Sequence, residues 1–318
     1  MVHEKKLKYI LKLMKQVNFL KNILLPAEIK LRDIIEIGSL DNNKLSKEQI
    51  KSIKRAIKFG YLPWPKKISS YIVNKDVLDV GCGTGLHSIG YHVYGAKSYT
   101  GLDPKINYNN DKGKNLRKRK FEKFGWTPNN IMDLFPTVQF IQGIFEDIAP
   151  NKKFDIAILH NVTEHLHNLD QVFEGISTRL REDGKILYNH HNYYCWNGHH
   201  QMPKKIYDIN LSDKNQLKYI DWGHLSFAKN SNDKLSKKLN KITINQLFVM
   251  TEKYFEIEIW DEIISRPKEG IDRLTDEILK KHHEYSKKDL ATQHIFCVGN
   301  LKCKRQKSSG HSSLSCAG

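Results

Sequence analysis

The sequence has no run of apolar residues close to the roughly twenty that a bilayer-spanning helix requires. Its first residues, MVHEKKLKYILKLMKQ, alternate lysines with apolar side chains and lack the apolar core of a signal peptide. Cysteine is scarce as well: the five residues are odd in number, and no two of them have the close spacing of a metal site. These absences argue against a disulfide framework, and we expect a cytoplasmic protein without a transmembrane segment.

Acidic residues are fewer than basic ones, 35 against 52, and the formal net charge is +17. Three segments carry most of the excess: residues 1–30 have seven lysines and two glutamates, residues 105–123 have eight basic and two acidic side chains, and residues 301–318 have four basic ones. This distribution suits a solvated surface at least as well as a groove for phosphates. Nucleic acid therefore stays an alternative partner.

The two ends of the chain differ in composition from the middle. Apolar residues at helical spacing indicate that residues 1–60 form a helical extension or cap, and FGYLPWPKK, with two prolines around Trp64, predicts a rigid connector after it. Residues 304–318 have almost no apolar content, which predicts a disordered tail. Helices of the extension are expected at 7–25, 27–37 and 46–58.

Between residues 61 and 303, short apolar strands alternate with helical segments. This order predicts an α/β fold, a Rossmann-like and mostly parallel sheet with helices on both faces, in which ligands bind beyond the carboxyl ends of the strands. Strands are expected at 77–80, 98–102, 138–142, 154–159, 185–189, 255–260 and 294–298. Helices are expected at 85–94, 113–124, 168–181 and 243–254, and insertions near 105–136, 190–240 and 262–290.

The stretch VLDVGCGTG places Gly81, Gly83 and Gly85 directly after the first predicted strand. Glycine permits a positive φ and lets a ligand touch the backbone, so the stretch predicts a tight, ligand-binding turn. Dinucleotide-binding proteins use the spacing G-x-G-x-x-G, whereas this chain has G-x-G-x-G with Asp79 in front of it. A carboxylate in that position repels a diphosphate and attracts a cation.

A second acidic residue follows at the end of the next predicted strand, SYTGLDP. Asp103 lies eighteen residues after Gly85, and a carboxylate in that position can accept hydrogen bonds from both hydroxyls of a ribose. The turn and Asp103 together predict a ligand that carries a positive charge and a ribose.

The motifs VLDVGCGTG, GLDP, FDIAILHNVTEHL and LREDGKILY occur in an order that resembles the class I S-adenosylmethionine-dependent methyltransferases. The resemblance covers residues 60–302 and implies a seven-stranded sheet with an antiparallel last strand. Its implied cofactor is S-adenosylmethionine. Many relatives have an acidic residue where this chain has Ile144, so the adenine amino group would be bound by Glu146, Asp147 or the backbone. The implied cofactor residues are Gly81, Cys82 and Gly83 for the methionine part, Asp103 for the ribose, Ile144, Phe145 and Glu146 for the adenine, and His160 and Asn161 near the sulfonium. Asp79 and Gly85 are further cofactor-binding residues.

Methyl transfer to an alcohol or phenol needs a nucleophile in line with the methyl group and a base that takes its proton. Two histidine-rich stretches, HNVTEHLHN and NHHNYYCWNGHHQMP, follow the fourth and fifth predicted strands. Neutral imidazole is a suitable base near neutral pH. We expect His165 or His191 to be this base, with Glu164 as a further catalytic residue.

A metal site is the competing hypothesis. The chain resembles small-RNA 2′-O-methyltransferases and some quinone-pathway O-methyltransferases, which have E-x-x-E-H after the fourth strand and a distant histidine that completes a magnesium or zinc site. This chain keeps Glu164 and His165, has Asn161 at the first glutamate, and would need His199 or His224 as the distant ligand. Losing one carboxylate weakens a site for a hard cation, so a divalent metal is not favoured.

The acceptor is predicted from the loops that follow the fifth strand. Aromatic rings beside hydrogen-bonding groups suit a sugar or an aromatic ring, and the alternative is a loop anchored by buried aromatic side chains. The segments HHNYYCWNGHHQ and WGHLSF resemble bacterial methyltransferases associated with surface-polysaccharide synthesis. The expected acceptor residues are Tyr193, Tyr194, Trp196, His199 and His224.

Three functions follow from these predictions. The leading hypothesis is O-methylation of a sugar, a glycan or another small hydroxylated acceptor with a histidine base. The alternative is an RNA methyltransferase, acting on tRNA or small RNA through the basic segments, with or without the assistance of a metal ion. A methyltransferase-like binding subunit is the third hypothesis, and the intact motif around Gly81 and Asp103 argues against it.

Overall fold

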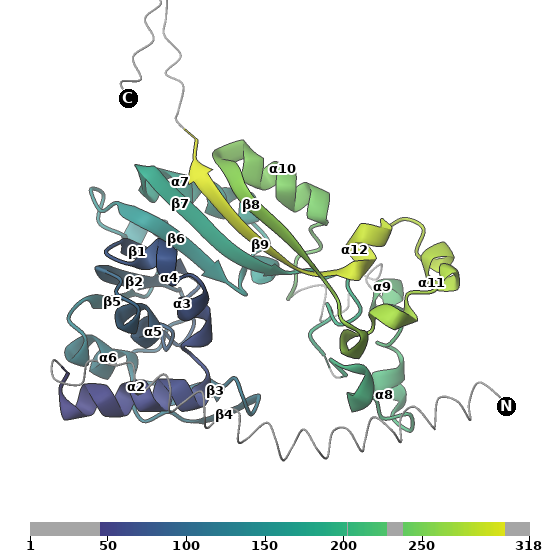
Figure 1. The fold of residues 1–318 in the computed structure, drawn as a ribbon, viewed down its shortest axis with the longest axis horizontal. Coiled ribbons are helices and arrows are strands. Elements are labelled where there is room, and N and C mark those ends of the chain that lie inside the picture. The colour runs from purple at the N-terminus through teal and green to yellow at the C-terminus, as the bar shows by residue number, and fades with distance from the viewer. Residues whose placement is uncertain (1–44, 202, 228–237, 303–318) are drawn as a thin grey trace, which may run out of the picture.

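The computed structural model describes residues 45–201, 203–227 and 238–302 (Figure 1). The predicted helices at 7–25 and 27–37 and the predicted tail at 304–318 lie outside these ranges. Among the helices that the structure describes, none combines the length and the apolar character needed to cross a membrane.

The centre of the molecule is a seven-stranded sheet in the order β5-β2-β1-β6-β7-β9-β8. The first five of these strands pair in parallel, and β9 is antiparallel to both β7 and β8. The predicted fold class is confirmed, including the antiparallel last strand that the resemblance implies. The strands are β1 (Asp76–Val80), β2 (Ser98–Leu102), β5 (Val138–Ile141), β6 (Phe154–His160), β7 (Leu180–His191), β8 (Phe255–Ile264) and β9 (Thr292–Leu301).

Both faces of the sheet are buried, as the continuous apolar strands predict. Neighbouring residues of β1 belong to different hydrophobic clusters: Val77 packs into one and Leu78 into the other. The Val77 cluster is covered by α2 (Lys47–Phe59), α3 (Pro63–Lys67), α4 (Ser69–Ile72), α5 (Ser88–Val93) and α6 (Pro128–Leu134). The Leu78 cluster is covered by α7 (Leu169–Arg179) and α10 (Ile244–Tyr254).

Helix α2 matches the helix predicted at 46–58 and has clear sequence signals at both ends. Ser46 and Gln49 form a capping box at its start, and Gly60 closes its end with a φ of 87°. Its buried residues, including Ile53 and Ile57, pack against the sheet domain. This last part of the N-terminal extension is therefore joined to the domain core.

The helix predicted at 113–124 is wrong, because this segment forms a hairpin of β3 (Lys112–Asn115) and β4 (Lys120–Lys123). Burial alternates along β3, and Gly113 faces inward so closely that a Cβ atom there would lie 2.4 Å from Leu86 Cδ1. Arg119 has a φ of 58°, which a helix does not allow. The segment lacks the buried apolar stripe that would stabilise a helix.

The insertions predicted near 190–240 and 262–290 contain their own hydrophobic cluster, which includes Trp196, Trp222 and Leu290. Their elements gather at the end of the long strands where β7 and β8 finish and β9 begins (Figure 1). The carboxyl ends of the parallel strands lie on the same side. The helices here are α8 (Lys214–Leu217), α9 (Gly223–Phe227), α11 (Asp276–Lys281) and α12 (Lys287–Ala291).

Candidate active site

The glycine turn after β1 is tight on one side and open on the other. A Cβ atom on Gly81 would lie 2.5 Å from Val162 Cγ2, and one on Gly85 would lie 2.4 Å from the Phe140 ring. Gly83 differs, because its φ is 60° and no heavy atom lies within 4 Å of a Cβ placed there. The turn is thus closed against the domain at its two ends and leaves its middle residue open to a ligand.

Asp103 lies beside this open residue. One carboxylate oxygen, Oδ2, accepts a 2.9 Å hydrogen bond from the Gly83 backbone N–H, and Oδ1 accepts a 2.8 Å bond from the Lys105 N–H. Each oxygen keeps a second lone pair, and the side chain is only half-buried. The carboxylate is therefore held in position and can still accept hydrogen bonds from two hydroxyl groups.

Asp79 lies underneath the turn rather than on its surface. The residue is buried, and its Oδ2 atom accepts a 2.7 Å hydrogen bond from the Tyr99 hydroxyl. Burial raises the pKa of Asp79 to about 7, and the nearby Asp103 acts in the same direction while the Tyr99 hydrogen bond opposes it. The neighbouring Cys82 packs closely against Gly101.

The turn after β5 holds the residues expected at the adenine. Phe145, in the 3-10 turn η2 (Phe145–Asp147), packs against Gly175 of α7 and joins the hydrophobic cluster on that face. Asp147 Oδ2 accepts a 2.8 Å hydrogen bond from the Ile144 backbone N–H. Phe145 is half-buried, with one side of its ring against α7, and its contact with the adenine stays a prediction. Ile144 is 56% exposed and Glu146 is exposed, so these two side chains remain free to reach a ligand.

At the end of β6, His160 lies in an aromatic cluster. The Trp64 ring stacks on the His160 ring with centroids 4.2 Å apart and planes within 6°, and the His87 ring meets it edge-on at 4.9 Å. Burial holds the pKa of His160 well below its usual range, and the neighbouring His87 acts in the same direction. Trp64 was predicted only as part of a connector, and the structure brings it to the strand end from α3.

Asn161 follows with a φ of 55°, in the left-handed region that asparagine tolerates better than most residues. Its Oδ1 atom accepts a 2.6 Å hydrogen bond from Asn189 Nδ2 on β7. The ends of β6 and β7 are thereby tied together beside the glycine turn, because β1 and β6 are neighbours in the sheet.

Four side chains from these strand ends and the following loops converge. Glu164 and His165 lie in the 3-10 turn η3 (Thr163–His165) after β6, His191 ends β7, and His200 follows nine residues later. The Glu164 Oε1 atom lies 4.0 Å from both His165 Nε2 and His200 Nε2, and His191 Nδ1 faces His200 Nε2 within hydrogen-bonding distance. His200 was counted in a histidine-rich stretch, but no role was predicted for it.

Glu164 is only 2% exposed, which is unusual for a carboxyl group. Burial raises its pKa to about 7, and hydrogen bonds from the backbone of Glu164 and His191 offset part of this rise. Burial also holds the pKa of His191 well below its usual range, and it lowers the pKa of His200 to about 3. At neutral pH both of these histidines are uncharged.

The hydrogen bonds of His165 and His191 define which nitrogen of each ring carries the proton. His165 Nδ1 lies 3.1 Å from the Lys238 carbonyl oxygen, which can only accept, so Nε2 carries the free lone pair. His191 Nε2 lies 3.3 Å from Asn197 Oδ1, so its Nδ1 is the unprotonated nitrogen. His165 is exposed and can reach a ligand, whereas His191 is engaged through both nitrogens.

His199 and His224 do not join this cluster. Both are buried, their rings lie 5.1 Å apart, and His224 Nε2 donates a 3.0 Å hydrogen bond to the Tyr193 carbonyl. The His199 Nδ1 atom accepts from the Gln201 N–H at 3.0 Å. The predicted distant metal ligand is therefore corrected, because His200 and not His199 or His224 lies beside Glu164.

The aromatic residues of the 193–196 loop form core rather than surface. Tyr193, Tyr194 and Trp196 are buried, and Tyr194 donates its hydroxyl hydrogen to the Lys241 carbonyl at 2.6 Å. Trp196 packs so closely on Gly270 that a Cβ atom there would lie 2.3 Å from the indole. Buried rings cannot stack on an acceptor, so their expected binding role is corrected in favour of the buried-anchor alternative.

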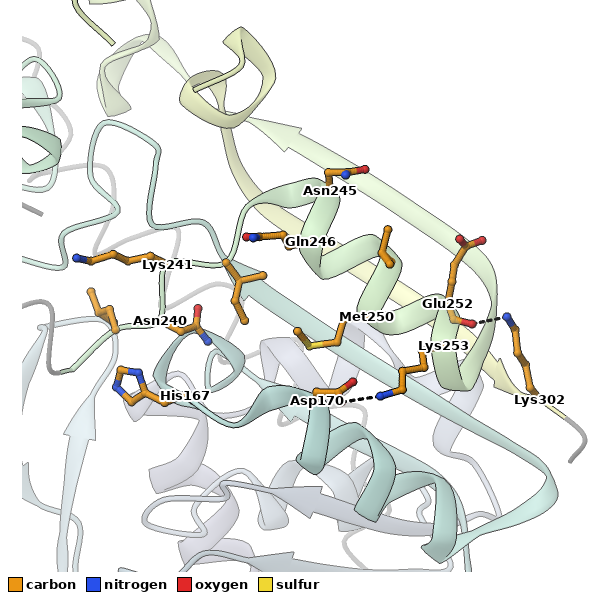
Figure 2. A pocket seen from close by; sticks show the side chains of 13 residues that line it. His167, Asp170, Asn240, Lys241, Asn245, Gln246, Met250, Glu252, Lys253 and Lys302 are labelled. Carbon is orange, nitrogen blue, oxygen red and sulfur yellow. Dashed lines mark hydrogen bonds and ion pairs between the residues drawn. The ribbon is translucent and has the colours of Figure 1, made fainter. Parts of the chain in front are cut away.

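A groove of about 1150 Å³ lies away from the glycine turn, between α7, α10 and the segment before α10 (Figure 2). Lys253 pairs with Asp170 at 2.7 Å on one wall, and Lys302 donates to the Glu252 carbonyl at its far end. At the other end, Asn240 donates hydrogen bonds to the Thr163 and Leu166 carbonyls and so holds the turn that carries Glu164. The groove includes none of the cofactor residues predicted above.

The strand order and the site define a class I methyltransferase fold. The chain belongs to the family described as "Methyltransferase domain", whose profile matches residues 53–247. The protein is therefore an S-adenosylmethionine-dependent methyltransferase, with S-adenosylmethionine as its cofactor. The open space beside Gly83 and the Asp103 carboxylate, which can accept hydrogen bonds from two hydroxyl groups, fit this molecule.

Individual relatives are distant or match in part. A tRNA U34 carboxymethyltransferase of Nautilia profundicola is 35% identical over 104 residues, and this match spans 26% of the present chain and about a third (33%) of that protein. An S-adenosylmethionine-dependent methyltransferase structure from Mesorhizobium loti is 14% identical with a TM-score of 0.43 and covers 74% of this chain and 96% of its own. The YcgJ protein from Bacillus subtilis is 14% identical with a TM-score of 0.43 and covers 77% and 99%.

Proposed function

We propose that the protein transfers the methyl group of S-adenosylmethionine to a hydroxyl oxygen of a sugar, a glycan or another small acceptor, with His165 as the base. The observation that carries the proposal is the exposed His165 imidazole, whose Nδ1–H is bound to the Lys238 carbonyl and whose Nε2 lone pair is free. It lies in the turn after β6, five residues beyond His160. A neutral imidazole in this position can take a proton from an acceptor hydroxyl.

The cofactor residues retain the roles that the resemblance implies. Gly81, Cys82 and Gly83 line the methionine part, and Asp103 binds the ribose. For the adenine we propose Ile144 and Glu146, which are exposed in the turn after β5, together with the half-buried Phe145. His160 and Asn161 lie near the sulfonium.

In the proposed reaction the acceptor oxygen attacks the methyl carbon from the side opposite the sulfur. The carbon–sulfur bond breaks and its electron pair stays on sulfur, which leaves as a neutral thioether. The new carbon–oxygen bond takes its electrons from the acceptor oxygen, whose proton goes to His165 Nε2. His191 is less suited to this step, since both of its nitrogens already have partners.

The insertions at 190–240 and 262–290 support a role in choosing the acceptor. They pack together around Trp196 and Leu290 and rise from the strand ends that carry His191 and Thr292. Ligands of open α/β sheets bind beyond these ends. We propose that these two insertions form the acceptor side of the site, and that their buried aromatic rings support its shape without touching the acceptor.

RNA is the second candidate acceptor, and two observations favour it. One relative that matches part of the chain acts on a tRNA. In addition, positive charges from the 105–123 segment approach the site. Burial lowers the pKa of Lys204, and Lys114 and Arg119 add to this effect. Burial also lowers the pKa of His200, and Lys204 and Lys114 act in the same direction. Such a group of cations suits a phosphate-bearing acceptor, which includes both RNA and nucleotide-linked sugars.

Transfer of a labelled methyl group tests the two acceptors directly. The protein is incubated with methyl-labelled S-adenosylmethionine and either a panel of oligosaccharides and nucleotide sugars or unmodified tRNA, and the products are weighed by mass spectrometry. We expect a sugar product heavier by one methyl group, and its loss in the His165→Gln variant. Label in tRNA alone would replace the proposal with the RNA alternative, and binding to RNA should then weaken steeply with added salt.

A further inference from the structure

Three donor atoms from separate parts of the chain meet next to the proposed acceptor site. Glu164, His191 and His200 each offer one atom, and the three atoms all lie within 4.8 Å of one another. They come from the turn after β6, the end of β7 and the loop that follows β7. The three residues are not neighbours in the sequence. The fold brings them together from two strand ends and a loop.

The lone pair of His191 is aimed into this group by a hydrogen bond on the other side of the ring. Its Nε2–H donates to Asn197 Oδ1, and the same oxygen accepts a 3.2 Å hydrogen bond from Gln293 Nε2. Asn197 Nδ2 in turn donates to the Lys204 carbonyl at 3.2 Å, which sets the orientation of the amide. Metal-binding histidines are typically held in this way by a partner on the second nitrogen.

Glu164 is a buried carboxyl group, and the backbone hydrogen bonds from Glu164 and His191 satisfy it only in part. The side chain is 3% exposed, and its Oε1 atom lies 4.0 Å from both His165 Nε2 and His200 Nε2, beyond hydrogen-bonding distance. Its other oxygen has a weak contact, 3.4 Å, with the Thr163 hydroxyl. A buried carboxylate is costly unless it is paired or coordinates a metal.

We propose that Glu164, His191 and His200 bind a divalent transition-metal ion of the zinc type. Two imidazole nitrogens and one carboxylate oxygen favour Zn²⁺ or Co²⁺ over Mg²⁺ and Ca²⁺, which prefer oxygen ligands. Three protein ligands are typical of catalytic zinc sites, which leave a further position open to a water molecule or a substrate. The site differs from the one that the sequence predicted, because its distant ligand is His200 and His191 replaces His165.

The role of the metal rests on the proposed function. An acceptor hydroxyl in the open position would bind the metal through its oxygen, and a metal ion lowers the pKa of such a hydroxyl. His165 remains outside the three-atom group and keeps its free Nε2 as the proton acceptor. The metal site and the base thus have separate residues and can be tested separately.

Cobalt binding provides the test, because Co²⁺ reports its coordination by visible absorption without any methyl transfer. Untagged protein is stripped of metal with a chelator and titrated with Co²⁺, followed by Zn²⁺ and, separately, Mg²⁺. We expect visible bands that saturate at one equivalent of Co²⁺ and disappear on addition of Zn²⁺ but not of Mg²⁺. Failure of the wild type to bind Co²⁺ or Zn²⁺ stoichiometrically would overturn the metal site.

Variants show whether these three residues are the ligands. His200→Ala and Glu164→Gln should each weaken Co²⁺ binding by more than about tenfold, and Asn197→Ala should weaken it through His191 by roughly 10- to 100-fold. His165→Gln, and His283→Ala on the exposed surface, should bind Co²⁺ as the wild type does. Circular dichroism identifies any variant that fails to fold, and a folded His200→Ala protein with unchanged affinity contradicts the proposal.

The outcomes separate the metal site from the proposed function. Stoichiometric Co²⁺ binding without methyl transfer to any sugar would support the site and remove the proposed acceptor class. Transfer that persists in a metal-free protein, with no Co²⁺ bands, would remove the metal site and leave His165 as the base.

Discussion

The Trp64 ring lies flat on the His160 ring, with centroids 4.2 Å apart and planes within 6°. This stack joins α3, which follows the N-terminal extension, to the strand end where the sulfonium is proposed to lie. Trp64 Nε1 also donates a 3.0 Å hydrogen bond to the Tyr91 hydroxyl, and Lys67 lies 4.0 Å from the centroid of the Phe296 ring. The segment before β1 therefore packs against the strand end that the proposed site includes.

Trp64→Ala should destabilise the protein by about 3–5 kcal/mol, the usual cost of deleting a buried indole. Urea unfolding followed by circular dichroism measures this loss. Trp64→Phe keeps a flat ring against His160 and loses the hydrogen bond to Tyr91 and part of the indole packing, so its loss of stability should be smaller than that of Trp64→Ala. Equal stability of Trp64→Ala and the wild type would show that the stack contributes nothing to folding.

Replacing His165 separates the base from cofactor binding. His165→Gln should lower kcat by roughly 100- to 10,000-fold, the usual contribution of a general base, with little change in the affinity for S-adenosylmethionine. His167→Gln is the matched control, since it is an exposed histidine two residues away in the same segment. A parallel loss of cofactor affinity and rate in His165→Gln would instead indicate a structural role.

Gly83 and Gly125 form a second matched pair. Both have a positive φ and open space around a Cβ atom, with φ values of 60° and 102°. Alanine at either position should cost about 1–2 kcal/mol of backbone strain. Only Gly83→Ala should weaken S-adenosylmethionine binding in calorimetry, because its methyl group enters the space proposed for the ligand. Similar affinities for the two variants would place the ligand elsewhere.

Stability should fall as the pH decreases from 7 to 5. Burial lowers the pKa of His224 from 6.5 to about 4, so the unfolded chain takes up a proton first and the folded state loses relative stability below pH 6.5. Because the His224 ring is completely buried, this pKa difference should lower the free energy of unfolding by about 2 kcal/mol at pH 5. His87, with a pKa lowered to about 4, acts in the same direction. His190, with a pKa lowered to about 3, adds to the loss. Asp79 and Glu164, with pKa values raised to about 7, oppose it by gaining stability as the pH falls.

Urea unfolding of the wild type and of His224→Gln at pH 7 and pH 5 isolates this contribution. Glutamine can still donate a hydrogen bond to the Tyr193 carbonyl but does not titrate. The wild type should lose more stability than the variant on acidification. Identical losses in the two proteins would contradict the assigned pKa shift of His224.

The central strands were predictable because they are short apolar runs that must be buried on both faces, as in β1 and β6. The hairpin of β3 and β4 was not, because its decisive feature is the close packing of Gly113 on Leu86, a contact between distant elements. The lysines and arginines of this segment contain no apolar pattern that would indicate a strand. The helix predicted at 113–124 also had no apolar periodicity to support it.

The candidate site also contains some residues that could be placed from the sequence and others that could not. The proximity of Gly83 and Asp103 could be predicted because it depends on the local backbone and a fixed order of motifs. The position of His200 beside Glu164 depends on the path of a loop, so its only sequence signal was the abundance of histidines after β7. For Tyr193 and Trp196 the sequence left two alternatives open, because composition does not distinguish an aromatic binding face from a buried anchor.

Calorimetric titration of the wild type and of Asp103→Ala with S-adenosylmethionine tests the central claim that the glycine turn and Asp103 form the methyl-donor site. The Asp103 carboxylate is proposed to accept hydrogen bonds from both ribose hydroxyls, so its loss should lower the affinity by roughly 10- to 100-fold. Asp170→Ala, which removes only an ion pair in the remote groove, should bind as the wild type does. An unchanged affinity in Asp103→Ala would contradict the account.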